Sequence, residues 1–335
     1  MKGPACLRWI GGWIGPLLLS LGLGLGLGLG LGLGLGLGLG LGLAAQALAA
    51  APSGLPVTGL DKATDAWDAL LAKHVRPSGG VDYIGFAADM PQLKEFTEAY
   101  KKMSFKDASD DVKKAAYINL YNAGMIYNVL RYAAAQHIAA TSPQFTSFKI
   151  DSLKSGAGNL WNGDLTLQIG ADHLTLDDIE HHLLRGAGAS SKQTLLRVSQ
   201  LDPRLHAAVN CAAYSCPRLR PSAYRAATID ASLQKAMQEY LSDPEQFHKN
   251  SDDQLRANSI VFWYYDDFDD YGKKLGTGGA GDYLAQFIQD NAEDAVWKRA
   301  FLHEHFNNRS KFALKLSSSF DFSYQWLIND VRNKP

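Results

Sequence analysis

The first 50 residues differ sharply in composition from the rest of the chain, and this break decides which part can fold into a domain. Two basic residues, Lys2 and Arg8, lie in the first eight residues. Residues 9–43 then form an apolar run in which glycine and leucine alternate for over twenty residues. Each glycine costs a helix roughly 1 kcal/mol relative to alanine, so the repeat is a poor choice for a helix of a folded domain. It fits a segment that only has to be apolar. We therefore expect a linker at residues 51–60 and one globular domain at residues 61–335.

The leader has the pattern of a secretory signal. A charged start and an apolar middle are followed by a small-residue end, Ala44–Pro52, with cleavage expected near Leu48 to Ala51. The apolar run is longer than a usual signal core, and at about 1.5 Å per residue it could span a bilayer of about 30 Å. An uncleaved anchor at residues 9–43 is therefore the alternative. In both cases we expect the body to be exported, periplasmic or extracellular.

The composition of the body indicates a globular domain without a basic face. Hydrophobic residues make up 46% of the chain and charged residues 20%, which excludes a disordered chain. The whole chain has a formal net charge of -1, and the leader contains two basic and no acidic residues, so the body lies near -3. Nucleic acid is therefore not expected as a partner.

Apolar periodicity predicts an α+β domain that is mostly helical, with a small antiparallel sheet. Ser109 is expected to cap the clearest helix, and Thr175 with Asp178 forms a variant of the capping box. Helices are predicted at residues 61–75, 81–101, 110–135, 179–185, 230–241, 282–291 and 295–303. Strands are predicted at residues 165–169, 259–265 and 312–316. No internal repeat and no further domain boundary are expected.

The densest chemical segment is Leu201 to Tyr224, which holds one histidine, two cysteines, three prolines and three arginines. A nucleophilic thiol needs a base within hydrogen-bond reach and a third group that orients the base. Cys211 is the candidate nucleophile, His206 the candidate base and Glu180 the candidate orienting carboxylate. Alternatives stay open at each position. Cys211 could be inert core packing or could form a disulfide with Cys216. His206 could be structural, and Glu180 could be an exposed helix charge or an ion-pair partner of Arg185.

Metal and cofactor chemistry is not expected. Zinc accepts the ligand types present at His173, Glu180, His181, His182, His206 and the two cysteines, but none of them shows a tight zinc spacing. The chain also lacks a Walker loop, a dinucleotide fingerprint, a nucleophile elbow and a His-Glu-x-x-His motif. Nucleotide and dinucleotide enzymes are therefore unexpected.

Two asparagines interrupt the apolar helix that follows Ser109. Asn119 and Asn122 are three residues apart, so they share one helical face. Buried amides must be hydrogen-bonded, so these two either clamp a loop or line a pocket.

The body resembles the domain-of-unknown-function family 547. The motifs that carry the resemblance are Val81-Asp82-Tyr83, AYINLYNA (116–123), LTLDDIEHHLLR (174–185), DPRLHAAVNCAAYSCPRLRPSAY (202–224), FWYYDDF (262–268) and FDFSYQWLIND (320–330). The polar motif residues are Asn119, Asn122, Glu180, His181, Arg185, Asp202, Arg204, His206, Cys211 and Cys216. One departure is the absence of a glycine shortly after Cys211.

The resemblance implies an exported or membrane-associated α+β domain, and we infer from it a cysteine-hydrolase-like site on a papain- or transglutaminase-like core. The first hypothesis is a thiol-dependent hydrolase or acyl transferase acting on an amide or ester of the cell envelope. Its support residues would be Asn119, Asn122, Arg185, Asp202, Arg204 and Cys216. The second is a non-enzymatic envelope binding module with a small-molecule, peptide or glycan ligand. A Cys211–Cys216 bond would favour the module.

Overall fold

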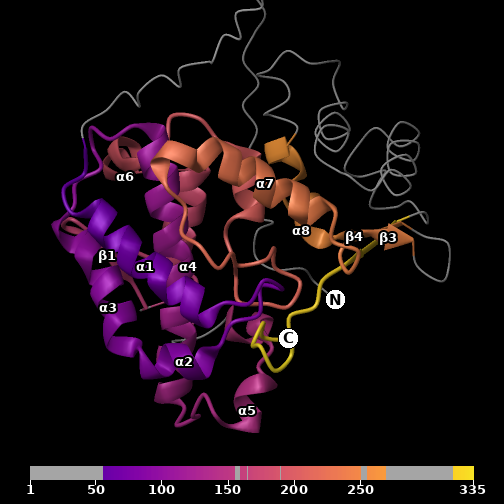
Figure 1. Ribbon diagram of the computed structural model, residues 1–335. Helices are drawn as coiled ribbons and strands as arrows, with labels where there is room; N and C mark the ends of the chain where they lie inside the picture. Colours follow the sequence, from indigo (N-terminus) through magenta and orange to yellow (C-terminus); the bar gives the residue numbers. More distant parts are fainter. Residues whose placement is uncertain (1–55, 155–158, 164, 189, 250–254, 269–319) are drawn as a thin grey trace, which may run out of the picture. The chain divides into compact units, whose positions relative to one another are not determined.

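The computed structural model describes residues 56–154, 159–163, 165–188, 190–249, 255–268 and 320–335. Within these ranges the chain is mostly helical and has two small sheets (Figure 1). The α-helices are α1 (Leu60–His74), α2 (Tyr83–Ala88), α3 (Met90–Ala99), α4 (Asp110–Ala135), α5 (Pro143–Thr146), α6 (Ser191–Leu196), α7 (Ile229–Leu241) and α8 (Ser259–Trp263). The 3-10 helices are η1 (Tyr100–Lys102), η2 (Ile150–Lys154), η4 (Pro203–Ala207) and η5 (Ala226–Thr228), and η3 (Asp178–Leu184) is a π-helix. The strands are β1 (Leu167–Ile169), β2 (Asp172–Leu174), β3 (His248–Lys249), β4 (Leu255–Asn258) and β5 (Phe320–Ser323).

These elements confirm the predicted α+β class, mostly helical with a small antiparallel sheet. Strand β1 pairs with β2, and β3 with β4, in antiparallel register. Strand β5 pairs with β4 in parallel, which the sequence did not predict. The helices predicted at residues 282–291 and 295–303 and the strand at 312–316 lie outside the described residues. The papain- or transglutaminase-like core stays a prediction.

Helix α4 is the centre of the main core. It begins where predicted, because the Ser109 side chain accepts a hydrogen bond from the Val112 N–H at 3.3 Å, and two acidic residues follow in the first turn. Its middle is buried on nearly every side, and helices α1, α2, α3, α7 and η3 all pack against it. Gly124 allows β1 to approach closely, since a Cβ there would meet Leu167 Cδ1 at 2.3 Å.

The predicted capping box at Thr175 is present. Asp178 N–H donates to Thr175 Oγ1 at 3.0 Å, and Thr175 N–H donates to Asp178 Oδ2 at 2.9 Å. The helix that follows is wider than an α-helix, because the Arg185 N–H bonds the Glu180 carbonyl five residues back at 2.9 Å. Such π-turns often occur at functional sites. Gly186 then ends the helix with φ of 69°.

A smaller second core joins α7, β4 and α8. The prediction of a strand at residues 259–265 was wrong, because residues 259–263 form α8. The Asn258 side chain accepts a hydrogen bond from the Ile260 N–H at 3.0 Å and starts a helix there. Capping and burial of Ile260 and Val261 outweigh the β-propensity of the valine and the aromatic residues.

The C-terminal segment ties distant parts of the domain together. The Tyr214 N–H donates to the Leu327 carbonyl at 2.6 Å, the Asn329 N–H to the Ala212 carbonyl at 2.9 Å, and the Val81 N–H to the Asn329 carbonyl at 2.9 Å. These bonds bring the segment alongside the cysteine-containing loop.

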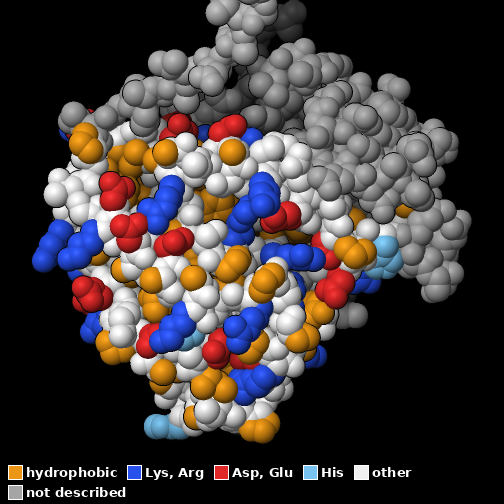
Figure 2. Space-filling model, in the orientation of Figure 1, with side chains coloured by type: hydrophobic (Ala, Val, Ile, Leu, Met, Phe, Trp, Pro, Cys, Tyr) orange, Lys and Arg blue, Asp and Glu red, His pale blue; other side chains and the backbone are white. Residues whose placement is uncertain are grey.

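The described surface carries charges of both signs. On the face in Figure 2, Lys and Arg side chains are interspersed with Asp and Glu rather than gathered into one patch. Among the described helices, none is both long and apolar enough for a membrane crossing, and residues 9–43 lie outside the described part.

Candidate functional site

Two asparagines of α4 clamp the cysteine-containing loop, residues 201–224, at its middle and at its C-terminal end. Asn122 Nδ2 donates to the Ala208 carbonyl at 2.9 Å, and its Oδ1 accepts from the Asn210 N–H at 2.8 Å. Asn119 makes both of its bonds to one residue: its Nδ2 donates to the Tyr224 carbonyl at 2.7 Å, and its Oδ1 accepts from the Tyr224 N–H at 2.9 Å. Each buried amide is thus satisfied on both sides by backbone, which is the clamping alternative of the two predicted roles.

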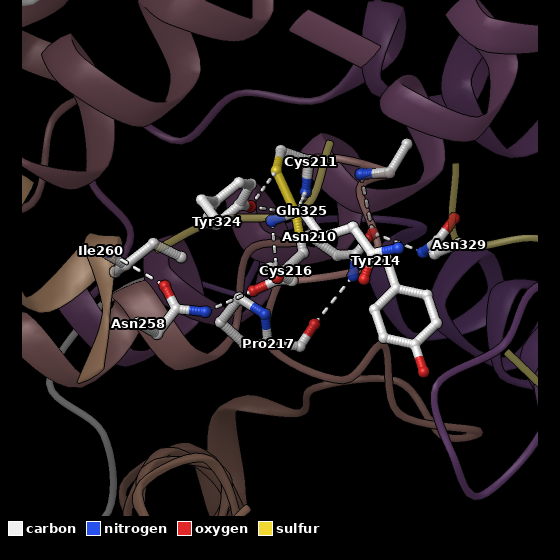
Figure 3. The surroundings of a disulfide bond; sticks show 12 residues. Asn210, Cys211, Tyr214, Cys216, Pro217, Asn258, Ile260, Tyr324, Gln325 and Asn329 are labelled. Carbon is white, nitrogen blue, oxygen red and sulfur yellow. Dashed lines mark hydrogen bonds between the residues drawn. A yellow bond between two sulfur atoms is a disulfide. The ribbon is translucent and has the colours of Figure 1, made fainter. Parts of the chain in front are cut away.

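Asn210 clamps the loop from inside. Its Nδ2 donates to the Pro217 carbonyl at 2.8 Å, and its Oδ1 accepts from the Ala212 N–H at 2.9 Å and from Asn329 Nδ2 at 3.0 Å (Figure 3). These bonds hold Ala212 at φ of 64°, a left-handed conformation that alanine rarely adopts. This is where a glycine was expected after Cys211, and alanine occupies the strained position instead.

Cys211 and Cys216 form a disulfide, one of the three alternatives open from the sequence (Figure 3). Cys216 is only 2% exposed, whereas Cys211 is half-buried. The Cys211 N–H points at Cys216 Sγ at 3.0 Å, and the Tyr324 hydroxyl lies 3.0 Å from each sulfur. Since a disulfide sulfur carries no hydrogen, the tyrosine is the donor in both contacts.

His206 lies in the core, 1% exposed, with Asp267 as its partner. Its Nε2 lies 2.7 Å from Asp267 Oδ2, and its ring stacks on Tyr264 with centroids 3.8 Å apart. An ionised carboxylate only accepts, so Nε2 carries the hydrogen. Burial lowers the pKa of His206, and Arg185 acts in the same direction, although Asp267 acts to raise it. The neutral ring therefore presents Nδ1 as an acceptor, which has no partner within the described residues.

Arg185 binds the Asp267 carboxylate in a bidentate ion pair. Its Nε and Nη2 donate to the two carboxylate oxygens at 2.6 and 2.9 Å, and its guanidinium lies 4.8 Å from the Tyr264 ring centroid. Burial acts to raise the pKa of Asp267, but the hydrogen bonds from His206 and Arg185 outweigh it and keep the pKa far below its usual range. Arg185 Nη1 also donates to His181 Nδ1 at 2.8 Å.

Glu180 is buried on π-helix η3 and is bound by Tyr264, whose hydroxyl donates to Oε1 at 2.6 Å. Burial acts to raise the pKa of Glu180, but the His181 ring and the Tyr264 hydrogen bond lower it overall. The expected arrangement, with Glu180 orienting His206 beside Cys211, is therefore not the one observed. Asp267 takes the place expected for Glu180, and no described hydrogen bond joins His206 to Cys211.

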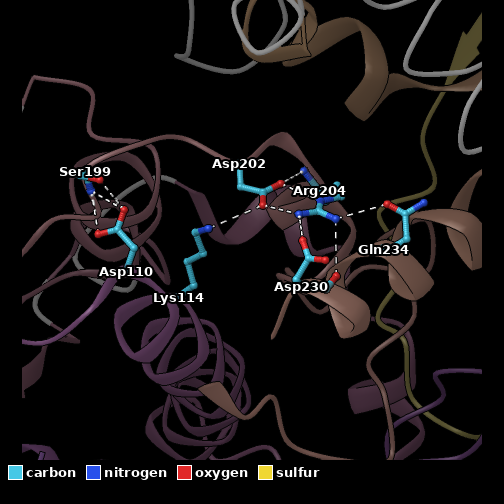
Figure 4. Close-up of polar contacts among 7 residues, drawn as sticks. All are labelled: Asp110, Lys114, Ser199, Asp202, Arg204, Asp230 and Gln234. Carbon is cyan, nitrogen blue, oxygen red and sulfur yellow. Dashed lines mark hydrogen bonds and ion pairs between the residues drawn. The ribbon is translucent and has the colours of Figure 1, made fainter. Parts of the chain in front are cut away.

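Asp202 and Arg204 form a separate charged group at the start of η4 (Figure 4). Arg204 Nε and Nη2 donate to the two Asp202 oxygens at 3.0 and 2.8 Å, and Nη2 also reaches Asp230 Oδ1 at 2.7 Å. Burial acts to raise the pKa of Asp202, but Arg204 outweighs it and the pKa is lowered. This pair anchors the loop to α7 and does not contact the cysteines.

Three contributors were not singled out from the sequence: Tyr264, Asp267 and Tyr324. The first two lie in FWYYDDF (262–268) and the third in FDFSYQWLIND (320–330), segments noted only for resemblance. The signal that could have found Asp267 is an unpaired acidic residue in an aromatic, buried stretch, which needs a cationic or imidazole partner. Across the described ranges, no group of three or more His, Cys, Asp or Glu side chains is arranged to hold a metal ion.

Comparison with known proteins gives a family match over part of the chain. No curated protein and no solved structure is matched by the chain. Residues 105–241 match the family model described as "Protein of unknown function, DUF547". The match includes the asparagine motif, the η3 helix and the disulfide loop, and it bears out the resemblance noted from the motifs. This match supports a DUF547 assignment for residues 105–241.

Proposed function

We propose that the chain is an exported binding module for a peptide or glycan, in which the cysteine, histidine and asparagine motifs hold loops beside the ligand site. The observation that carries this proposal is the Cys211–Cys216 disulfide, because it leaves neither Cys211 nor Cys216 with a free thiol that could act as a nucleophile. The secretory pattern of the leader supports a location outside the cytoplasm. The disulfide is in keeping with that location, since disulfides persist in oxidising compartments.

A half-buried aromatic group next to the disulfide supports a ligand site there. The Trp263 ring lies 4.9 Å from Tyr324 and 5.6 Å from Trp326, centroid to centroid, and all three side chains are half-buried. Tyr324 links this group directly to both sulfurs. Large aromatic side chains with one accessible part are enriched at interfaces, because they bring apolar area and polar atoms together.

The test is binding of soluble cell-wall glycan fragments and of a peptide library to the mature chain, followed by calorimetry. We expect Trp263→Ala to weaken binding at least tenfold. Trp161→Ala is the matched control, since Trp161 is also half-buried but lies in residues 159–163. Binding that Trp263→Ala and Trp161→Ala weaken equally, or no binding to either ligand class, would contradict the proposal.

One observation favours a second candidate, the thiol-dependent hydrolase or acyl transferase acting on an amide or ester. His206 is neutral, is oriented by Asp267 through Nε2, and has Nδ1 without a described partner, as a general base requires. This function needs the disulfide to open and the Cys211 sulfur to reach that nitrogen. It predicts that reduced protein hydrolyses activated esters and that both His206→Gln and Cys211→Ala abolish turnover. The binding-module proposal predicts that the reduced wild type, His206→Gln and Cys211→Ala all hydrolyse the esters at the same background rate.

A further inference from the structure

We propose that the Cys211–Cys216 disulfide is a site of thiol–disulfide exchange. A low-molecular-weight thiol attacks Cys211 Sγ, and Cys216 leaves as a thiolate held by the Cys211 backbone N–H and the Tyr324 hydroxyl. This activity goes beyond ligand binding and does not depend on it.

The two sulfurs differ in environment, which sets the direction of attack. Cys211 is half-buried and Cys216 is 2% exposed. A thiolate approaching from solvent therefore reaches Cys211 first. Exchange rates depend on which sulfur is accessible and on how well the other one leaves.

The buried sulfur lies against two hydrogen-bond donors. The Cys211 N–H and the Tyr324 O–H both lie 3.0 Å from Cys216 Sγ. Donors of this kind stabilise a thiolate more than a neutral sulfur. The Tyr324 hydroxyl lies equally close to Cys211 Sγ, so the Cys211 N–H is the donor that makes Cys216 the better leaving group. Burial, together with Glu180, raises the pKa of Tyr324, so its hydroxyl keeps its proton and remains a donor at neutral pH.

The loop has other restraints that keep its shape when the disulfide opens. Asn210 bonds Pro217 and Ala212 on either side of the cysteines, Asn122 holds the Asn210 N–H, and the Tyr214 N–H bonds Leu327. Opening the bond therefore leaves the two sulfurs close together, so that the disulfide can re-form.

The exchange balances in two steps. In the first, a bond forms between the attacking sulfur and Cys211 Sγ while the Cys211–Cys216 bond breaks, and its electron pair stays on Cys216. In the second, another thiolate attacks the mixed disulfide, releases Cys211 as a thiolate and forms the small-molecule disulfide. Two thiols are thus oxidised, and the protein disulfide is reduced by two electrons.

The experiment uses glutathione on the native mature chain near neutral pH, with acid quenching and mass spectrometry. We expect reduction without denaturant. Reduced single-cysteine variants are then treated with glutathione disulfide, and we expect Cys211 in Cys216→Ala to form the mixed disulfide at least tenfold faster than Cys216 in Cys211→Ala. Reduction only in denaturant, or equal rates for the two variants, would overturn the proposal.

Tyr324→Phe separates thiolate stabilisation from general packing, because the ring is kept. We expect it to slow reduction by glutathione about tenfold, the order of a hydrogen bond to a charged group, and to raise the pKa of the Cys216 thiol in reduced protein. Tyr100→Phe is the matched control, since it also removes a buried donor, which bonds the Ala116 carbonyl at 2.9 Å. Equal exchange rates in the two variants would contradict the role of Tyr324. Ligand binding is measured separately, so its failure would not affect this result.

Discussion

The motif residues divide into two regions that use different physics. Around the disulfide loop, neutral amides from Asn119, Asn122 and Asn210 bond backbone groups, and each is satisfied on both faces. Around His206, charged groups are stacked and paired, with one ring nitrogen left without a described partner. A fully satisfied network specifies a shape, whereas a network with an open acceptor keeps a capacity for chemistry. The difference shows that motif residues close together in sequence can belong to two different hydrogen-bond networks.

The largest effect should come from the amide region. Replacing Asn122 by alanine leaves the Ala208 carbonyl and the Asn210 N–H buried without their partner. We expect the free energy of unfolding to fall by about 3 kcal/mol, since each unsatisfied buried group costs roughly 1–3 kcal/mol. Urea unfolding measures this change, with exposed Gln92→Ala as the control. A loss below about 1 kcal/mol would show that the clamp is not structural.

A smaller effect is expected in the charged region. Asp267→Asn removes the charge that Arg185 pairs with, and the partly exposed arginine can turn toward water, so we expect a loss of about 2 kcal/mol, less than for a fully buried pair. Arg185→Met combined with Asp267→Asn should cost less than the sum of the single changes, because no charge is left unpaired. Additive losses in urea unfolding would mean that the two residues act independently.

The pH dependence sharpens the comparison, because the charged region contains His206, whose pKa burial lowers. Burial lowers the pKa of His206 in the folded chain, so the unfolded chain binds the proton at higher pH. The free energy of unfolding should therefore decrease as the pH falls below about 6.5, the usual histidine value. His206→Gln should flatten this decrease, and His173→Gln, an exposed control, should not. An unchanged slope in His206→Gln would place the titration elsewhere.

The smallest effect is expected at the exposed end of the Asp202 group. The Asp230 side chain is 86% exposed, although it lies 2.7 Å from Arg204. Exposed ion pairs contribute little, so Asp230→Asn should change the free energy of unfolding by less than about 0.5 kcal/mol. Asp202→Asn, which changes the buried carboxylate that the same Arg204 binds, should cost more. Equal losses in thermal unfolding would mean that exposure does not separate the two carboxylates.

Local signals predicted much of the fold. The cap at Ser109, the reciprocal bonds of Thr175 and Asp178, and the apolar stripe of α7 act within a few residues, so the sequence displays them directly. The parallel pairing of β4 with β5 joins segments more than sixty residues apart and leaves no local pattern. Helix α8 was missed because one capping asparagine outweighed the β-propensity of the residues that follow it.

The sequence predicted which residues belong to the candidate site, but not which of them contact one another. Every predicted residue except Asp202 and Arg204 lies in or beside the two regions described above. The partner of His206 is Asp267, 61 residues away, and residue types alone do not distinguish it from Glu180. The state of Cys211 could not be decided either, because a free thiol, a packed thiol and a disulfide share the same sequence.

The most direct test of the central claim, that these motifs hold a loop rather than form a thiol nucleophile, is alkylation of the native protein by iodoacetamide without reductant across pH 5–9. We predict no labelling of Cys211 or Cys216 in the wild type. Labelling well below pH ~8.5 that disappears in Cys211→Ala and weakens in His206→Ala would contradict the account and establish an activated thiol.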